Sequence, residues 1–241
     1  MFQTLIFSRP WPVSEPILIL FDCDGTLLDS AALIVEVMQG AFVAQGIKEP
    51  NPTAIRRQIG LNLEHVISSL GMPDEQLHAA VEAYKQEMRW RRSQAPLPEP
   101  MFDGMKEWLH QLAMTDEVVL GIATGKSLRG LQASLAHHGI LDLFMILRTP
   151  DHGPGKPDPF MVVDACHHLG IPPSRTIVIG DTTYDMMMAK SAGALALGVS
   201  WGYHEPSELV AAGAQKIMDQ PASFCPVHYF FRSDAQPNRT S

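Results

Sequence analysis

The segment ILILFDCDGT, residues 17–26, decides the fold. Its first five residues form a continuous apolar run of strand length, and a run without polar alternation is typical of a strand buried on both faces of a parallel sheet. Similar runs occur at residues 118–123, 144–147 and 176–179, with a weaker one at 194–197. Helical patterns lie between the later runs. This alternation predicts an α/β fold with a doubly wound parallel sheet.

The helical patterns fall into two groups. Those between the later strands are expected at about residues 103–113, 127–138, 158–169 and 183–192. Another group, with no convincing strand among them, is expected at about residues 31–45, 53–58, 62–70 and 74–92. The second group predicts an α-helical insert after the first strand. The expected organisation is an α/β core at residues 16–30 and 99–225, the insert at 31–98, a leader at 1–15 and a tail at 226–241.

The composition excludes several classes of protein. Hydrophobic residues make up 46% of the 241 residues and charged residues only 18%, which excludes a disordered chain. The 26 acidic residues outnumber the 18 lysines and arginines, and an acidic chain without a basic run is a poor match for nucleic acid. No apolar stretch approaches the ~18 residues of a membrane span, and no secretion signal is evident. The three cysteines are far apart, so we expect a cytoplasmic protein without disulfides.

Polar residues follow the strand runs or lie in the adjoining loops. They are Asp22, Asp24, Thr124, Lys156, Asp181 and Asp185. Each alone could be a helix cap, a turn residue or a solvated lysine. Together they fall at the edge where open α/β sheets bind ligands, which predicts one functional site. Carboxylates that converge there would repel one another without a divalent cation, and a hard ion with oxygen ligands, Mg²⁺, fits.

These residues resemble the motifs of the haloacid dehalogenase-like hydrolase superfamily. Residues 22–30 are similar to its first motif, Thr124 to the second, Lys156 to the third and residues 180–185 to the fourth. The resemblance runs from about residue 17 to residue 220, and the helical insert resembles the family's C1-type cap. Within the family, the residues of these motifs are most similar to those of phosphoglycolate phosphatase-like enzymes. The resemblance therefore implies a phosphoric monoester hydrolase.

The family's mechanism carries over to matching positions. Asp22 would attack phosphorus and form an aspartyl-phosphate, while Asp24 would protonate the leaving alkoxide and then activate water. The implied ligands of Mg²⁺ are Asp22, Asp181 and Asp24, the last through its backbone carbonyl, while Asp185 would hold the metal through water or orient Asp181. The residues expected to bind the substrate are Cys23, Gly25, Thr124, Gly125 and Lys156, with Arg56 and Gly60 reaching in from the cap.

Alternatives to a phosphatase stay open at this point. An acid at Asp24 favours phosphoryl transfer over dehalogenation, but a phosphomutase of the β-phosphoglucomutase type also needs Asp22 and Asp24. A phospho-ligand-binding protein without activity would be signalled by loss of an aspartate at position 22, 24 or 181, and all three are present. The expected partner is a small phosphorylated metabolite, of which phosphoglycolate is the leading candidate. The expected oligomeric state is a monomer or a homodimer.

Overall fold

The computed structural model describes residues 16–94 and 99–223. The expected leader at 1–15 and tail at 226–241 lie outside the described residues. Within them, no helix combines the length and the apolar character that crossing a membrane requires.

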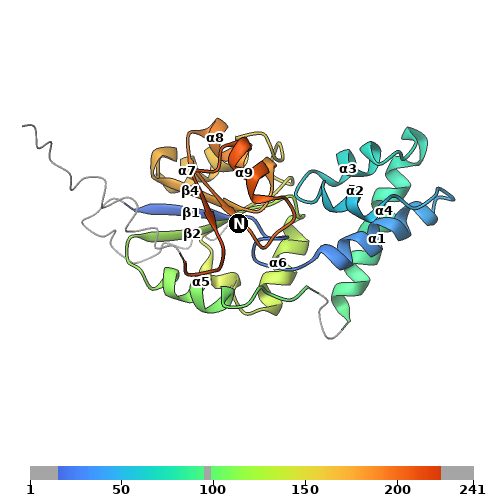
Figure 1. The fold of residues 1–241 in the computed structure, drawn as a ribbon. Coiled ribbons are helices and arrows are strands. Elements are labelled where there is room, and N and C mark those ends of the chain that lie inside the picture. Colours follow the sequence, from blue (N-terminus) through green and yellow to red (C-terminus); the bar gives the residue numbers. More distant parts are fainter. Residues whose placement is uncertain (1–15, 95–98, 224–241) are drawn as a thin grey trace, which may run out of the picture.

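A parallel sheet of six strands forms the centre of the described structure (Figure 1). Its strands lie in the order β3-β2-β1-β4-β5-β6, and each neighbouring pair is parallel. They are β1 (Ile17–Phe21), β2 (Val118–Ala123), β3 (Ile146–Arg148), β4 (Thr176–Gly180), β5 (Leu195–Val199) and β6 (Lys216–Met218). All five residues of β1 are fully buried, as the apolar run predicts. The predicted α/β fold class is confirmed.

Helices cover both faces of the sheet because alternate strand residues point to opposite sides. Ile17, Ile19 and Phe21 pack with helices α5 and α6, whereas Leu18 and Leu20 pack with α7, α8 and α9. Figure 1 shows these two layers on either side of the strands. The helices are α5 (Met105–Ala113), α6 (Leu128–His137), α7 (Phe160–Leu169), α8 (Thr183–Ala192) and α9 (Pro206–Ala212).

Two parts of the sheet domain differ from the expectation. Strand β3 lies at Ile146–Arg148, later than the expected 144–147, because a 3₁₀ turn at Leu141–Leu143 precedes it and Phe144 packs into the core. Helix α9 and the three-residue strand β6 are too short to produce a periodic pattern, and the sequence did not predict them.

A separate helical part is inserted between β1 and α5 and lies to one side of the sheet in Figure 1. Its helices are α1 (Ala31–Val43), α2 (Pro52–Arg56), α3 (Leu63–Ser69) and α4 (Asp74–Ser93). The side chains of Asn51 and Asn62 accept hydrogen bonds from the first backbone N–H groups of α2 and α3, which fixes where these helices begin. The helices enclose an apolar core of their own, so this part packs as a distinct unit.

Candidate active site

Asp22 lies immediately after the central strand β1 and is fully buried. Its Oδ1 accepts a hydrogen bond from the backbone N–H of Cys23 at 2.6 Å and lies 2.8 Å from the Nζ of Lys156. Its Oδ2 is buried and has no hydrogen-bond partner among the described residues. Burial raises the pKa of Asp22 to about 6, against the opposing effect of Lys156. One carboxylate oxygen is thus held in place while the other is uncommitted.

Lys156 is the cation at the centre of this site. Its Nζ lies 2.8 Å from Asp22 Oδ1 and 2.6 Å from Asp185 Oδ1, and its side chain is fully buried. Burial alone would lower the pKa of Lys156, but the two carboxylates more than offset this and raise it. The lysine therefore carries its charge at neutral pH and neutralises part of the acidic cluster.

Asp181 and Asp185 are presented by the turn between β4 and α8. Asp181 follows the strand and accepts hydrogen bonds from the Thr26 hydroxyl and from the backbone N–H of Tyr203, each at 2.9 Å. Asp185 is oriented by a capping box, in which its Oδ2 accepts from both the hydroxyl and the backbone N–H of Thr182. The turn thus aims both carboxylates back toward Asp22.

The three buried carboxylates of Asp22, Asp181 and Asp185 fit a divalent cation. Their oxygens lie within 4.8 Å of one another. Burial, followed by repulsion from Asp22 and Asp185, raises the pKa of Asp181 well above its usual range. A hard cation with oxygen ligands would relieve this repulsion. The structure brings together Asp22, Asp181 and Asp185, which are three of the four residues that the family resemblance implies at a metal site.

Asp24 lies beside the carboxylate cluster but is held by other groups. Its Oδ1 lies 2.8 Å from the Nζ of Lys126 and accepts a hydrogen bond from Ser30. Lys126 also contacts Glu99 at 2.9 Å, and Glu99 in turn is bound by Arg92. Although burial opposes it, Lys126 and Arg92 hold the pKa of Glu99 well below its usual range. Sequence reasoning missed this network; a lone Glu in a proline-rich stretch was the only available signal.

The predicted phosphate-binding loop residues lie around these carboxylates. Thr124 is buried at the end of β2, and its hydroxyl accepts a hydrogen bond from the backbone N–H of Lys126 at 3.4 Å. Cys23 is fully buried. Gly25 has φ +88°, and a Cβ there would lie 2.2 Å from Asp181 Oδ2, so only glycine fits.

One loop of the helical part touches the site. Gly60 has φ +98°, and a Cβ added to it would lie 3.9 Å from Asp22 Oδ2. A Cβ added to Gly125 would lie 2.4 Å from the carbonyl oxygen of Gly60, so the two glycine backbones are in close contact. The structure brings Gly60 to the site as expected. Arg56, in contrast, is exposed and does not line the cavity beside the site.

The comparisons with known proteins agree with this geometry. Residues 19–199 match the family model described as haloacid dehalogenase-like hydrolase. The chain belongs to this family. It is 35% identical over 206 residues to a probable phosphatase, IndB, of Dickeya dadantii, covering 84% of this chain and 89% of that protein. It is 31% identical to an N-acetylmuramic acid 6-phosphate phosphatase of Pseudomonas aeruginosa, with coverages of 84% and 90%.

Other similarities agree with the predicted subgroup and fold. This hydrolase is 27% identical to a phosphoglycolate phosphatase of Nitrosococcus oceani, covering 86% of this chain and 94% of that protein. Its fold matches a haloacid dehalogenase-like hydrolase of Streptococcus pneumoniae with a TM-score of 0.76, at 24% identity and coverages of 90% and 98%. The predicted family resemblance is confirmed, and so is the enzyme class, a phosphoric monoester hydrolase.

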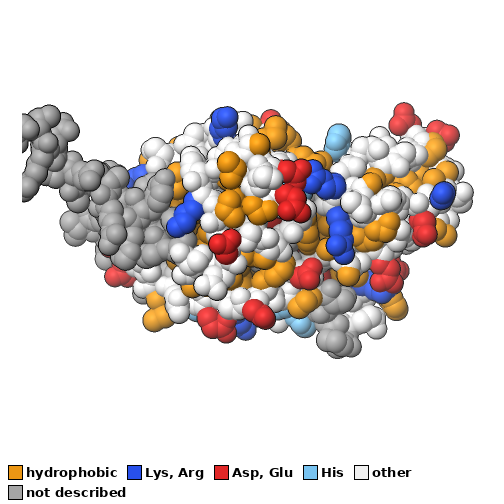
Figure 2. Space-filling model, viewed as in Figure 1, with side chains coloured by type: hydrophobic (Ala, Val, Ile, Leu, Met, Phe, Trp, Pro, Cys, Tyr) orange, Lys and Arg blue, Asp and Glu red, His pale blue; other side chains and the backbone are white. Residues whose placement is uncertain are grey.

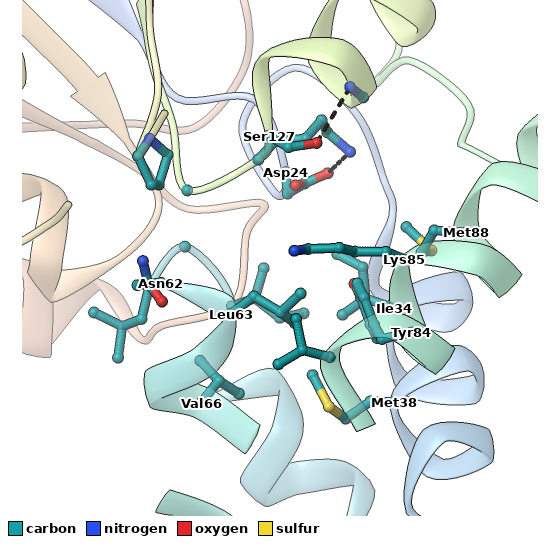
Figure 3. Close-up of a pocket in the computed structure, with 18 of the residues that line it drawn as sticks. Asp24, Ile34, Met38, Asn62, Leu63, Val66, Tyr84, Lys85, Met88 and Ser127 are labelled. Atoms are coloured by element: carbon teal, nitrogen blue, oxygen red, sulfur yellow. Dashed lines mark hydrogen bonds and ion pairs between the residues drawn. The ribbon is translucent and has the colours of Figure 1, made fainter. Parts of the chain in front are cut away.

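The hydrolase has a cavity of about 680 Å³ between the helical part and the sheet domain. Asp24, Lys126 and Ser127 line its sheet side, and Figure 3 shows Asp24 at the upper edge of the cavity. The helical part contributes an apolar wall of Ile34, Met38, Ile55, Ile59, Leu61, Leu63, Val66, Val81, Tyr84 and Met88. The cavity therefore extends from Asp24 into a partly apolar space.

The hydrolase also has a polar junction where α2 meets the sheet domain. The guanidinium of Arg57 forms a bidentate ion pair with Glu208, with both hydrogen bonds at 2.7 Å. The backbone carbonyl of Arg57 accepts hydrogen bonds from the Tyr184 hydroxyl and from His204 Nε2, each at 3.1 Å. Figure 2 shows acidic and basic side chains side by side at the surface where the two parts meet. These contacts hold the helical part over the site, and the sequence did not single out Arg57.

Proposed function

We propose that this hydrolase is a Mg²⁺-dependent phosphatase that hydrolyses a small phosphorylated metabolite in the cytoplasm through an aspartyl-phosphate on Asp22. The observation that carries the proposal is the state of Asp22. One of its oxygens is fixed by Cys23 and Lys156, and the other is buried without a hydrogen bond. An oriented carboxylate with an uncommitted oxygen is suited to in-line attack on phosphorus.

Charge neutralisation is the first requirement, because a phosphate dianion and a carboxylate nucleophile repel each other. Lys156 supplies one positive charge beside Asp22. Mg²⁺ held by Asp22, Asp181, Asp185 and the carbonyl of Asp24 would supply further positive charge for the phosphoryl oxygens. Thr124 and the backbone N–H groups of Asp24 and Gly125 would hold the remaining phosphoryl oxygens, while the N–H of Cys23 keeps Asp22 in place.

Proton transfer is the second requirement and falls to Asp24. Its carboxyl would donate a proton to the leaving alkoxide and later take one from the water that attacks the phosphoenzyme. The Asp24 carboxyl is positioned by Lys126 and Ser30, on the wall of the cavity where a leaving group would lie.

Helices α1–α4 would act as a cap, with the expected boundaries at residues 31 and 98. The contact between Gly60 and Gly125 supports this role, because it places cap backbone close to Asp22. A closed cap limits the access of water to the reacting groups and selects the leaving group.

The test is release of phosphate from p-nitrophenyl phosphate with Mg²⁺, by the native protein and by Asp22→Asn. The amide is nearly isosteric but is a poor nucleophile, so we expect a folded variant without turnover. Unchanged thermal unfolding of the variant is the control for folding. If a preparation of the variant free of deamidated protein retains roughly a tenth or more of the native kcat, Asp22 is not the nucleophile.

A further inference from the structure

We propose that the substrate carries a second anionic group besides the phosphate, and that Arg89 and Arg129 bind this group at the edge of the cavity. The inference rests on the proposed phosphatase function and narrows its substrate class. Arg89 belongs to α4 of the helical part and Arg129 to α6 of the sheet domain, and both line the cavity. An anion bound between them would join the two parts.

The first argument is that these two arginines lack partners in the part of the chain that the structure describes. Neither forms an ion pair or a hydrogen bond with any residue of 16–94 or 99–223. Residues 95–98, which follow α4, contain no acidic side chain. The neighbouring Arg91 and Arg92 are instead bound to Glu87 and Glu99. Guanidinium groups are suited to bidentate hydrogen bonding with carboxylate and phosphate groups.

The second argument is that the two arginines approach the same edge. The C-terminal part of α4 packs on the N-terminal part of α6, where a Cβ on Gly130 would lie 2.8 Å from a guanidinium nitrogen of Arg92. Arg129 is the residue before Gly130, and Arg89 lies about one helical turn before Arg92. The close contact of the two helices therefore places both cations at one margin of the cavity.

The third argument is the position of Arg129 within its helix. It occupies the first turn of α6, which contains no acidic residue. The helix dipole makes this end positive, so a cation here disfavours the helix while an anionic ligand favours it. Asp151 accepts a hydrogen bond from the backbone N–H of Leu128 but forms no ion pair with Arg129. The position of Arg129 is therefore suited to binding an anion.

The volume of the cavity between Asp24 and the two arginines indicates the size of the substrate. A cavity of about 680 Å³ is much larger than a two-carbon acid requires, because pockets of roughly 300–1,000 Å³ hold drug-sized ligands. Figure 3 shows the Lys85 amine pointing into this space, opposite Asn62 and above Leu63. Among the described residues, Lys85 pairs only with Glu82 of its own helix, at 3.2 Å. The structure thus favours a phosphate ester of about monosaccharide size with a second negative charge.

The experiment measures kcat/KM for matched pairs of phosphate esters that differ by one anionic group. One pair is N-acetylmuramic acid 6-phosphate and N-acetylglucosamine 6-phosphate, which differ by a lactyl carboxylate. A second is 6-phosphogluconate and glucitol 6-phosphate, two open-chain esters that differ by a carboxylate in place of a hydroxymethyl group. A third is glucose 1,6-bisphosphate and glucose 6-phosphate. This pair tests whether a phosphate can serve as the second anion in place of a carboxylate. We expect the native enzyme to prefer the doubly anionic member of at least one pair by about tenfold or more.

The variants are Arg89→Gln and Arg129→Gln, with Arg91→Gln as the matched control. Arg91 has the same charge and lies on the same helix, but it pairs with Glu36 and Glu87 and does not line the cavity. We expect Arg89→Gln and Arg129→Gln to lose the preference, while Arg91→Gln keeps it. Turnover of p-nitrophenyl phosphate, which has no second anion, should change less than about threefold in all three variants.

The outcomes separate this inference from the proposed function. A native enzyme without Mg²⁺-dependent turnover of any ester, p-nitrophenyl phosphate included, would refute the phosphatase and the anion site together. Turnover without a preference in any pair would overturn the anion site alone. Equal loss of kcat/KM for both members of the preferred pair in Arg89→Gln or Arg129→Gln would do the same, since it would indicate a general rather than a charge-specific effect.

Discussion

The contact between Gly125 and Gly60 gives the sharpest prediction about closure of the cap. A methyl group at position 125 would lie 2.4 Å from the carbonyl oxygen of Gly60, about 1 Å short of an ordinary contact at 3.4 Å. The obstacle is backbone on both sides, so it cannot be relieved by rotating a side chain. Gly125→Ala should therefore displace the cap loop by about 1 Å, and a displacement of this size can reduce the rate by about 100-fold.

The assay compares kcat/KM of Gly125→Ala with that of Gly40→Ala. Gly40 lies within α1, and a Cβ there meets nothing within 4 Å. Gly40→Ala should leave kcat/KM unchanged and stabilise the protein by about 0.5–1 kcal/mol, because alanine favours a helix more than glycine does. Both variants should unfold cooperatively. If Gly125→Ala keeps kcat/KM within about threefold of the native value, the cap does not close through this contact and the reasoning is refuted.

Three further predictions concern the charged groups. Glu99→Gln leaves Lys126 and Arg92 buried without their carboxylate, so urea unfolding at pH 7 should show a loss of about 3–5 kcal/mol. Because the pKa of Glu99 is lowered on folding, this stabilisation is present above the unfolded pKa near 4.5 and should diminish as the pH falls below it; a difference that grows on acidification would contradict the ion-pair explanation. Asp24→Ala should slow formation of the phosphoenzyme more with an alkyl ester than with p-nitrophenyl phosphate, by a factor of about 10²–10⁴ in rapid-quench experiments, whereas equal slowing would remove Asp24 as the general acid. Excess EDTA should abolish turnover and Mg²⁺ restore it, while Ca²⁺, which accepts more ligands at longer distances, should not; full activity in metal-free buffer would contradict the metal site.

The strand ends of this hydrolase could be predicted from the sequence because parallel strands bring their carboxyl ends to one edge. Asp22, Asp181 and Asp185 are brought together in this way, and predicting this cluster does not require knowing how the cap docks. The position of α2 could not be predicted, because it depends on that docking. A helical pattern does not distinguish Arg56 from Arg57, and it is Arg57 that meets Glu208.

The buried network around Glu99 could not be predicted from the sequence either. Its members are Arg92 near the end of α4, Glu99 in the segment before α5 and Lys126 in the loop after β2, and nothing in their spacing connects them. Strand β6 has three residues, too few for a hydrophobic pattern, and is held by its pairing with β5. These features arise from packing between distant segments, which local periodicity does not record.

The most direct test of the proposed mechanism is to trap the phosphoenzyme and locate its phosphoryl group. Native protein mixed with substrate and Mg²⁺ would be quenched in acid within milliseconds, digested, and analysed by mass spectrometry. We expect a hydroxylamine-sensitive phosphoryl group on Asp22 that forms no more slowly than turnover and is missing from Asp22→Asn. Turnover with no phosphoryl group on Asp22 at any time, or with one on another residue, would contradict the account.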